Sequence, residues 1–239
     1  MSVYNINNID KLLMENTYPG RGIIIGKTPD GKNAVIAYFI MGRSENSRNR
    51  IFVEAGDDVV IHPFDASKVE DPSLIIYLPI RKCEDKLIVT NGDQTDTVYE
   101  GLKAGKTFED SLESRCFEPD APNFTPRISG MLTFGENNFA YKMSILKSAD
   151  ENGSECNRYT FSYKSLAGLG HFIHTYNCDG NPIPTFTGEP ERVATLNDID
   201  EFTRVVWNSL NENNKISLYV RYVSLEDGKT VNRMINKNK

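Results

Sequence analysis

The chain has 239 residues, of which 39% are hydrophobic and 25% are charged. This balance supports a sizeable buried core and excludes wholesale disorder. The formal net charge of −6 argues against a duplex nucleic acid as a partner, because such a partner needs a broad basic face. The longest apolar run, residues 34–41, is far too short to span a bilayer.

The four cysteines, Cys83, Cys116, Cys156 and Cys178, lie far apart and form no C-x-x-C pair. The N-terminus shows no signal peptide, and in that setting scattered cysteines are typical of reduced thiols. We therefore expect a cytoplasmic protein that does not interact with a membrane.

The first forty residues predict a short helix followed by a β-hairpin. Residues 9–14 are expected to be helical, with Asn7 or Asn8 placed to cap the helix. Strands are expected at 23–25 and 33–41, joined by a turn that contains Pro-Asp-Gly. The second strand is so continuously apolar that we expect both of its faces to be covered.

The rest of the chain predicts more strands than helices. Helices are expected over 96–104, 108–114 and 199–210. Further strands are expected over 51–54, 59–62, 74–81, 87–89, 127–134, 139–146, 159–163, 171–176 and 216–223. Hairpin-like connections outnumber β-α-β crossovers, so we expect an α+β fold of antiparallel sheets with helices outside. No repeat or linker divides residues 1–239, which are expected to form a single domain.

Residues 42–50, GRSENSRNR, place a cationic segment in an acidic chain. An arginine side chain binds phosphate through two parallel hydrogen bonds. Arg43, Arg48 and Arg50, together with Arg21 before the first strand, therefore suggest an anion pocket at a shared end of the sheet. The alternative is an ordinary solvated loop.

A short buried strand at 87–89 runs directly into seven polar or glycine residues, NGDQTDT at 91–97. Asn-Gly is the strongest short hairpin signal. A hairpin needs two turn residues rather than seven, however, and residues 98–102 do not alternate cleanly. We therefore interpret 91–97 as a ligand-binding loop on a rigid scaffold, with a plain turn as the alternative.

His171 and His174, with Cys178 and Asp179 nearby, suggest a zinc site at first sight. Residues three apart on an extended strand point to opposite faces, however, so the two imidazoles do not easily share one metal. The chain also has no P-loop, no G-x-G-x-x-G and no G-x-S-x-G motif. We expect neither a metal nor a cofactor.

Four short elements, taken in this order, resemble the IMP cyclohydrolase family: YPGRG at 18–22, GRSENSRNR at 42–50, TNGDQTDT at 90–97 and TPRI at 125–128. The resemblance covers roughly residues 18 to 210. It implies a four-layer αββα sandwich of antiparallel sheets, similar to that of N-terminal-nucleophile hydrolases but without an N-terminal nucleophile.

Relative to the archaeal members, residues 1–17 form an N-terminal extension. The sequence around 147–157 is additional, and the segment 177–191 is different. In these respects the chain resembles a bacterial branch of the family.

The resemblance implies an enzyme of de novo purine biosynthesis that converts the nucleotide formyl-AICAR to IMP and water. It assigns catalysis to Arg50, Tyr77 and Glu118. The candidate substrate-binding residues lie within the matching elements: Arg21, Arg43, Asn49, Asn91, Gly92, Asp93, Thr95, Asp96 and Arg127. The sequence leaves open whether the chain forms a homo-oligomer.

Two functions of other classes remain open at this stage. An amidohydrolase could use the same pocket with water as the nucleophile, and it would release formate or ammonia. A non-catalytic purine-nucleotide-binding protein would bind IMP and leave formyl-AICAR unchanged.

Overall fold

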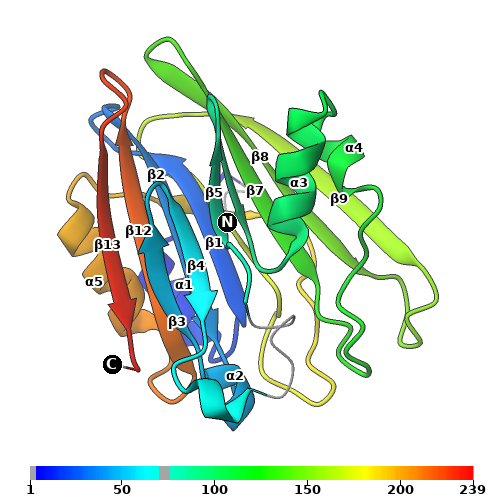
Figure 1. The fold of residues 1–239 in the computed structure, drawn as a ribbon. Helices are drawn as coiled ribbons and strands as arrows, with labels where there is room; N and C mark the ends of the chain where they lie inside the picture. The colour runs from blue at the N-terminus through cyan, green and yellow to red at the C-terminus, as the bar shows by residue number, and fades with distance from the viewer. Residues whose placement is uncertain (1–3, 70–75, 239) are drawn as a thin grey trace.

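A computed structural model describes residues 4–69 and 76–238. Within these residues, thirteen strands form two antiparallel sheets that pack face to face (Figure 1). The predicted α+β class with antiparallel sheets is therefore confirmed.

The first sheet is built around two strands from the front of the chain. Its members are β1 (Arg21–Lys27), β2 (Asn33–Met41), β10 (Leu169–His174), β11 (Glu191–Ala194), β12 (Lys215–Ser224) and β13 (Thr230–Asn236). They lie in the order β11-β10-β1-β2-β12-β13. All residues of β2 after Asn33 are buried, so the expectation that both faces of this strand are covered is confirmed.

The second sheet follows the order of the chain. Its members are β3 (Ile51–Ala55), β4 (Asp58–His62), β5 (Ile80–Cys83), β6 (Lys86–Thr90), β7 (Arg127–Gly135), β8 (Asn138–Ser148) and β9 (Cys156–Lys164). The strand predicted over 74–81 starts only at Ile80. Residues 76–79 precede it without regular structure, and 70–75 lie outside the described residues.

The side-chain alternation of β1 divides its isoleucines between two hydrophobic layers. Ile23 and Ile25 enter the core between the sheets, whereas Ile24 packs in the layer under the helices. Across the inner core, the rings of Tyr38 on β2 and Phe52 on β3 stack with their centroids 5.6 Å apart. This contact fixes the spacing of the two sheets close to the point where β2 ends.

Helices cover the outer face of each sheet (Figure 1). Helices α1 (Ile9–Glu15) and α5 (Ile199–Ser209) pack on the first sheet, and α3 (Gln94–Lys103) and α4 (Phe108–Leu112) pack on the second. None of the helices in the described residues is long and apolar enough to cross a membrane.

Several local predictions differ from the structure. A short helix, α2 (Glu45–Arg48), lies inside the segment predicted as a loop, because Ser44 and Ser47 form a reciprocal cap. Neither β11 nor β13 was predicted: β11 pairs with β10 across a long irregular segment, and β13, which forms a hairpin with β12, has the polar sequence of an exposed tail. Asn8 makes no side-chain cap, and the backbone of Asn7 instead bridges to Val193.

Helix α5 offers a test of the outer layer, because Phe202 is fully buried between this helix and the first sheet. We expect Phe202→Ala to lower the free energy of unfolding by about 3–5 kcal/mol, through lost burial and a residual cavity. The exposed neighbour Arg204 provides the control, since Arg204→Ala is expected to change stability by less than about 0.5 kcal/mol. Urea denaturation of both variants makes the measurement, and equal effects would contradict the packing described.

Candidate functional site

A cavity of about 550 Å³ opens at the end of the sandwich where β1 begins and β2 ends. A recess of about 20 Å³ adjoins it, and both are lined by Arg21, Arg50 and Glu118. Tyr77 also lines the recess. The three residues predicted to be catalytic, Arg50, Tyr77 and Glu118, are thus brought to one cavity from separate parts of the chain.

Arg21 and Arg50 present two positive charges to this cavity. Arg21 is the first residue of β1, and Arg50 directly precedes β3, so the two sheets contribute one guanidinium each. The Nε atoms of both are buried and have no hydrogen-bond partner in the described part of the chain. Because burying an unpaired charge is costly, this arrangement is suited to an anionic ligand.

The two guanidinium groups also act on one another. Burial lowers the pKa of Arg50, and the charge of Arg21 lowers it further. Burial acts to lower the pKa of Arg21 as well, but the adjacent Glu118 and several tyrosines outweigh it and raise that pKa. Both side chains remain cations, as arginines do in proteins.

Glu118 is the carboxyl group that faces these cations. Burial raises its pKa above the ordinary value, although Arg21 and Arg127 oppose this effect. Hydrogen bonds fix the segment that carries Glu118. The carboxylate of Asp120 accepts one from the backbone N of Thr125 at 2.6 Å and another from the hydroxyl of Thr125. The same hydroxyl lies 2.6 Å from the hydroxyl of Tyr176, which also lines the larger cavity.

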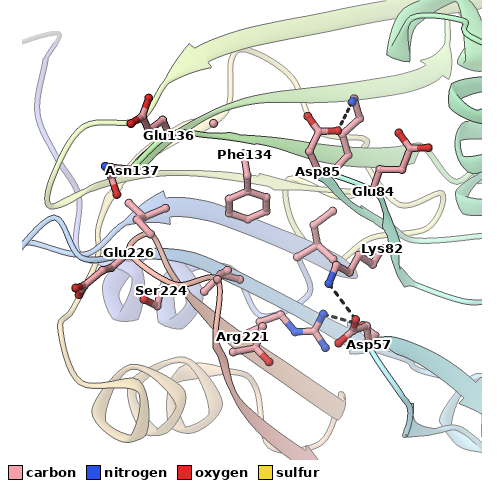
Figure 2. A pocket seen from close by; sticks show the side chains of 17 residues that line it. Asp57, Lys82, Glu84, Asp85, Phe134, Glu136, Asn137, Arg221, Ser224 and Glu226 are labelled. Atoms are coloured by element: carbon pink, nitrogen blue, oxygen red, sulfur yellow. Dashed lines mark hydrogen bonds and ion pairs between the residues drawn. The ribbon is translucent and has the colours of Figure 1, made fainter.

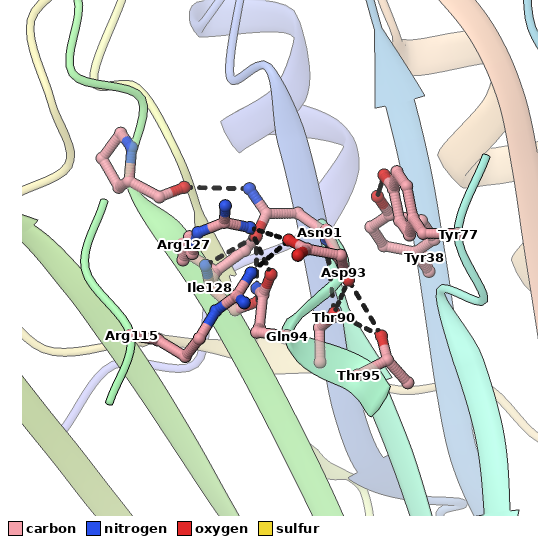
Figure 3. Close-up of polar contacts among 12 residues, drawn as sticks. Tyr38, Tyr77, Thr90, Asn91, Asp93, Gln94, Thr95, Arg115, Arg127 and Ile128 are labelled. Carbon is pink, nitrogen blue, oxygen red and sulfur yellow. Dashed lines mark hydrogen bonds and ion pairs between the residues drawn. The ribbon is translucent and has the colours of Figure 1, made fainter. Parts of the chain in front are cut away.

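Tyr77 lies in the irregular segment before β5, and its carbonyl accepts a hydrogen bond of 3.0 Å from the backbone N of Ile61. Its hydroxyl is 3.1 Å from that of Tyr38 (Figure 3). Burial raises the pKa of Tyr77, while the charges of Arg50 and Arg21 oppose the rise. A buried phenol with a raised pKa keeps its proton and can donate it.

The turn after β6 forms a framework beside the recess. The Oδ1 atom of Asn91 accepts hydrogen bonds from the backbone N of Ile128 and from Gln94, both 2.9 Å long (Figure 3). Its Nδ2 donates to the carbonyl of Pro126 at 2.9 Å. Asn91 therefore ties β6 to the start of β7, where Arg127 lies.

Gly92 provides the room that Arg127 occupies. A Cβ atom at position 92 would lie 2.5 Å from Nη1 of Arg127 and 2.6 Å from Oε1 of Gln94. Both distances are too short for real atoms, so only glycine leaves the arginine in its place.

Asp93 holds Arg127 at the edge of the recess. Its Oδ1 accepts from Nη1 of Arg127 at 2.7 Å and also pairs with Arg115. Partial burial acts to raise the pKa of Asp93, but the two arginines outweigh it and hold that pKa below the ordinary value. Asp93 was predicted to bind substrate, whereas the structure pairs its carboxylate with two side chains of the protein.

Three of the predicted binding residues do not line the cavity. The side-chain amide of Asn49 exchanges hydrogen bonds of 2.7 and 2.8 Å with the backbone of Asp65. The Thr95 hydroxyl bonds the carbonyl of Gly92, and Asp96 pairs with Arg81 at 2.7 Å. The physical reason for the last two is that α3 already begins at Gln94, which leaves only three residues in the turn.

Arg43 lines the larger cavity, but its guanidinium is engaged. Nη1 pairs with Asp179 at 2.6 Å and donates to the carbonyl of Gly180 at 2.8 Å. The guanidinium also lies over the ring of Tyr18, 5.1 Å from its centroid. Arg43 thereby links α2 to the segment after β10.

Several residues of the site were not predicted: Tyr18, Tyr38, Arg115, Asp120, Thr125 and Tyr176. Tyr18 and Thr125 begin the YPGRG and TPRI elements, so their positions carried a signal. Tyr176 reaches the cavity only because β10 pairs with β1, and no local pattern shows that pairing.

His171 and His174, which were predicted not to share a metal, form hydrogen bonds with different partners. Nδ1 of His171 lies 2.6 Å from the Tyr141 hydroxyl, and Nδ1 of His174 lies 2.8 Å from the Tyr176 carbonyl. Within residues 4–69 and 76–238, no group of three metal-ligating side chains is present.

A different cavity, of about 410 Å³, lies at the opposite end of the sandwich, where β7 and β12 end (Figure 2). Its buried arginine, Arg221, is fully engaged: Nη1 donates to the carbonyl of Asp57 and Nη2 to the hydroxyl of Tyr219, both at 2.7 Å. Glu136 and Glu226 add negative charge to the lining. Its two lysines, Lys82 and Lys86, pair with Asp57 and Asp85. Among the described residues that line this cavity, each cation thus has a partner, and the cavity does not suit a phosphate.

A family model described as "IMP cyclohydrolase-like protein" matches residues 18–228. The chain belongs to this family. The family inferred from the four sequence elements is confirmed, and with it the assignment of the chain to a family of enzymes.

The chain is also similar in sequence to curated IMP cyclohydrolases. The enzyme of Methanococcus aeolicus is 30% identical over 165 residues, which are 67% of this chain and 75% of that relative. The enzyme of Methanopyrus kandleri is 36% identical over 123 residues, 50% of this chain and 60% of the relative. The enzyme of Methanocella arvoryzae is 36% identical over 121 residues, 48% and 58% respectively, so the latter two relatives are matched over less than two thirds of their length.

The pairing of Asp93 predicts a pH-dependent contribution to stability. Because its pKa is lowered in the folded state, the pairing stabilises the protein above the ordinary carboxyl pKa of about 4. That contribution is lost as the pH falls through the lowered value. We expect Asp93→Asn to be less stable than the wild type at neutral pH, with the difference closing in acid, as measured by denaturation at several pH values.

Asp96→Asn is the matched control, since it removes an equally exposed carboxylate–arginine pair outside the cavity. It should leave the binding of nucleotide unchanged. The stability difference between Asp93→Asn and the wild type should shrink in acid. If it stays the same, the effect does not come from ionised Asp93.

Proposed function

We propose that this chain is an IMP cyclohydrolase that closes the purine ring of formyl-AICAR to give IMP and water in the cytoplasm. Family membership and the names of the curated relatives support this activity. The observation that carries the proposal is the pair of guanidinium groups of Arg21 and Arg50 beside Glu118 and Tyr77. Their buried Nε atoms have no partner within residues 4–69 and 76–238. The layering of helices on both outer faces fits the four-layer sandwich expected of the family.

The proposed reaction needs little chemistry from the protein. The carboxamide nitrogen attacks the formyl carbon of the same molecule, and the carbinolamine that forms then loses water. Because both reacting groups belong to one molecule, holding them in near-attack geometry supplies much of the rate. A cavity of about 550 Å³ with fixed cations is suited to holding a nucleotide in this way.

In this proposal each polar group has one role. Arg50 stabilises the negative charge that develops on the formyl oxygen. Glu118 accepts the proton that the amide nitrogen loses, and its raised pKa brings the carboxyl closer to the working range of a base. Glu118 passes that proton to the oxyanion, which becomes a hydroxyl. Tyr77 donates a proton to this hydroxyl, which leaves as water, and recovers a proton from the former formamide nitrogen as the C=N bond forms.

The same cavity offers a site for the 5′-phosphate. In the described part of the chain, the Nε of Arg21 has no hydrogen-bond partner, whereas Arg43 and Arg127 are already paired with Asp179 and Asp93. We assign the phosphate to Arg21, with the larger cavity lined by Tyr18 and Tyr176 receiving the rest of the nucleotide.

The direct test is to mix the purified protein with formyl-AICAR and follow the absorbance of the hypoxanthine ring, with product analysis in parallel. Formation of IMP supports the proposal. Release of formate or ammonia would identify an amidohydrolase instead. Binding of IMP with formyl-AICAR left unchanged would identify a non-catalytic binding protein.

For the catalytic pair, we expect Glu118→Gln and Tyr77→Phe each to lower the rate of ring closure at least tenfold, equivalent to about 1.4 kcal/mol in activation free energy. Each change removes a proton-transfer group while keeping its shape, so the dissociation constant for IMP should stay nearly the same. Glu136→Gln, at the opposite cavity, is the control. A wild-type rate in either variant would remove that residue from the mechanism.

For the phosphate site, we expect Arg21→Met to weaken IMP binding at least tenfold, because a hydrogen bond to a charged group is worth about 1.5–3 kcal/mol. Arg43→Met should weaken it less than about threefold, since a half-exposed ion pair contributes little. Isothermal titration calorimetry measures both. If Arg43→Met weakens IMP binding more than Arg21→Met does, the phosphate lies beside Asp179 rather than beside Glu118.

A further inference from the structure

We propose that Tyr38 is a positioning residue for ring closure: its hydroxyl donates a hydrogen bond to the oxygen of Tyr77, so that the proton of Tyr77 points into the cavity. This inference rests on the proposed function and extends the site to a residue that does not line the cavity. The two hydroxyls are 3.1 Å apart, and either atom is geometrically able to donate (Figure 3).

The hydroxyl of Tyr38 is buried and contacts the hydroxyl of Tyr77. The residue is 0% exposed, and in the described ranges its hydroxyl makes one hydrogen bond, to Tyr77. A buried hydroxyl that loses its partner is costly, so this bond is kept in the folded state. Tyr77 is likewise buried, and Tyr38 is its side-chain hydrogen-bond partner.

The two tyrosines differ in how firmly the fold holds them. Tyr38 lies in β2, paired to Ile23 of β1 on one side and to Tyr219 of β12 on the other, and its ring stacks on Phe52. Tyr77 belongs to the irregular segment before β5. The hydrogen bond therefore ties a residue of an irregular segment to a buried strand of the first sheet.

The electrostatic surroundings decide which tyrosine donates. The groups facing Tyr77 are Arg50, Arg21, Glu118 and Tyr38, and both arginines favour its ionised form. Burial raises the pKa of Tyr38 well above the ordinary value, so this phenol keeps its proton. Tyr38 is thus the standing donor, and its bond stabilises the negative charge that Tyr77 acquires when it gives its proton away.

The test is Tyr38→Phe, which removes one oxygen and keeps the ring that packs on Phe52. We expect kcat for ring closure to fall about tenfold while KM changes less than about twofold. The alkaline limb of the kcat–pH profile should move to higher pH, because Tyr77 loses a group that stabilises its ionised form.

The matched control is Tyr219→Phe. Tyr219 is equally buried on the neighbouring strand, and its hydroxyl bonds Arg221 rather than a residue of the cavity. This variant loses a buried hydrogen bond to a charged group, so its structural cost is expected to be at least as large as that of Tyr38→Phe. Its kcat and its pH profile are expected to match those of the wild type.

The double variant Tyr38→Phe with Tyr77→Phe separates action through Tyr77 from an independent effect. If Tyr38 acts through Tyr77, the double variant is no slower than Tyr77→Phe. If the rate loss of the double variant equals the product of the two single losses, the proposal is overturned. A wild-type rate and pH profile in Tyr38→Phe would overturn it as well.

A readout that does not need turnover keeps this inference distinct from the proposed function. In protein labelled with ¹³C at tyrosine Cζ, the Tyr77 signal is identified by its absence in Tyr77→Phe. Tyr38→Phe should shift that signal and Tyr219→Phe should not. An unchanged signal overturns the pairing even in an active enzyme, whereas a shift in a protein that does not close the ring refutes only the proposed function.

Discussion

Two guanidinium groups share one enclosed space, and the arrangement of both sheets serves to bring them there. Arg21 comes from the first sheet and Arg50 from the entry to the second, so neither sheet forms the site by itself. Glu118 lines the same space and favours the charged form of both arginines. An anion bound there would supply an acceptor for the Nε atoms of both.

The polar elements around this centre act mainly as a frame. Asn91 joins neighbouring strands, Asp93 fixes Arg127, and Thr125 fixes the segment that carries Glu118. A frame satisfied by its own hydrogen bonds keeps its geometry before the substrate arrives. Reactive groups can then be held in place without reorganisation during the reaction.

Much of the fold and of the candidate site could be predicted from the sequence. The remaining features depend on contacts that form only in the folded chain. The apolar run of β2 showed a strand buried on both faces, and the four sequence elements indicated the family and most residues of the cavity. Thr95 and Asp96 were misplaced because the polar stretch after β6 reads as a loop, although its later residues already belong to a helix. Tyr38 was missed because an aromatic residue in an apolar strand looks like core, and only the folded chain shows the hydroxyl it meets.

The close approach of Arg127 to Gly92 has a consequence for how this protein can change over evolutionary time. The backbone at position 92 has no positive φ, so conformational preference does not reserve it for glycine. The constraint is spatial: even an added methyl group would push the guanidinium away from Asp93. A substitution there is therefore expected to spare the fold and impair the site, which makes this position a sensitive marker of whether a descendant still uses its cavity.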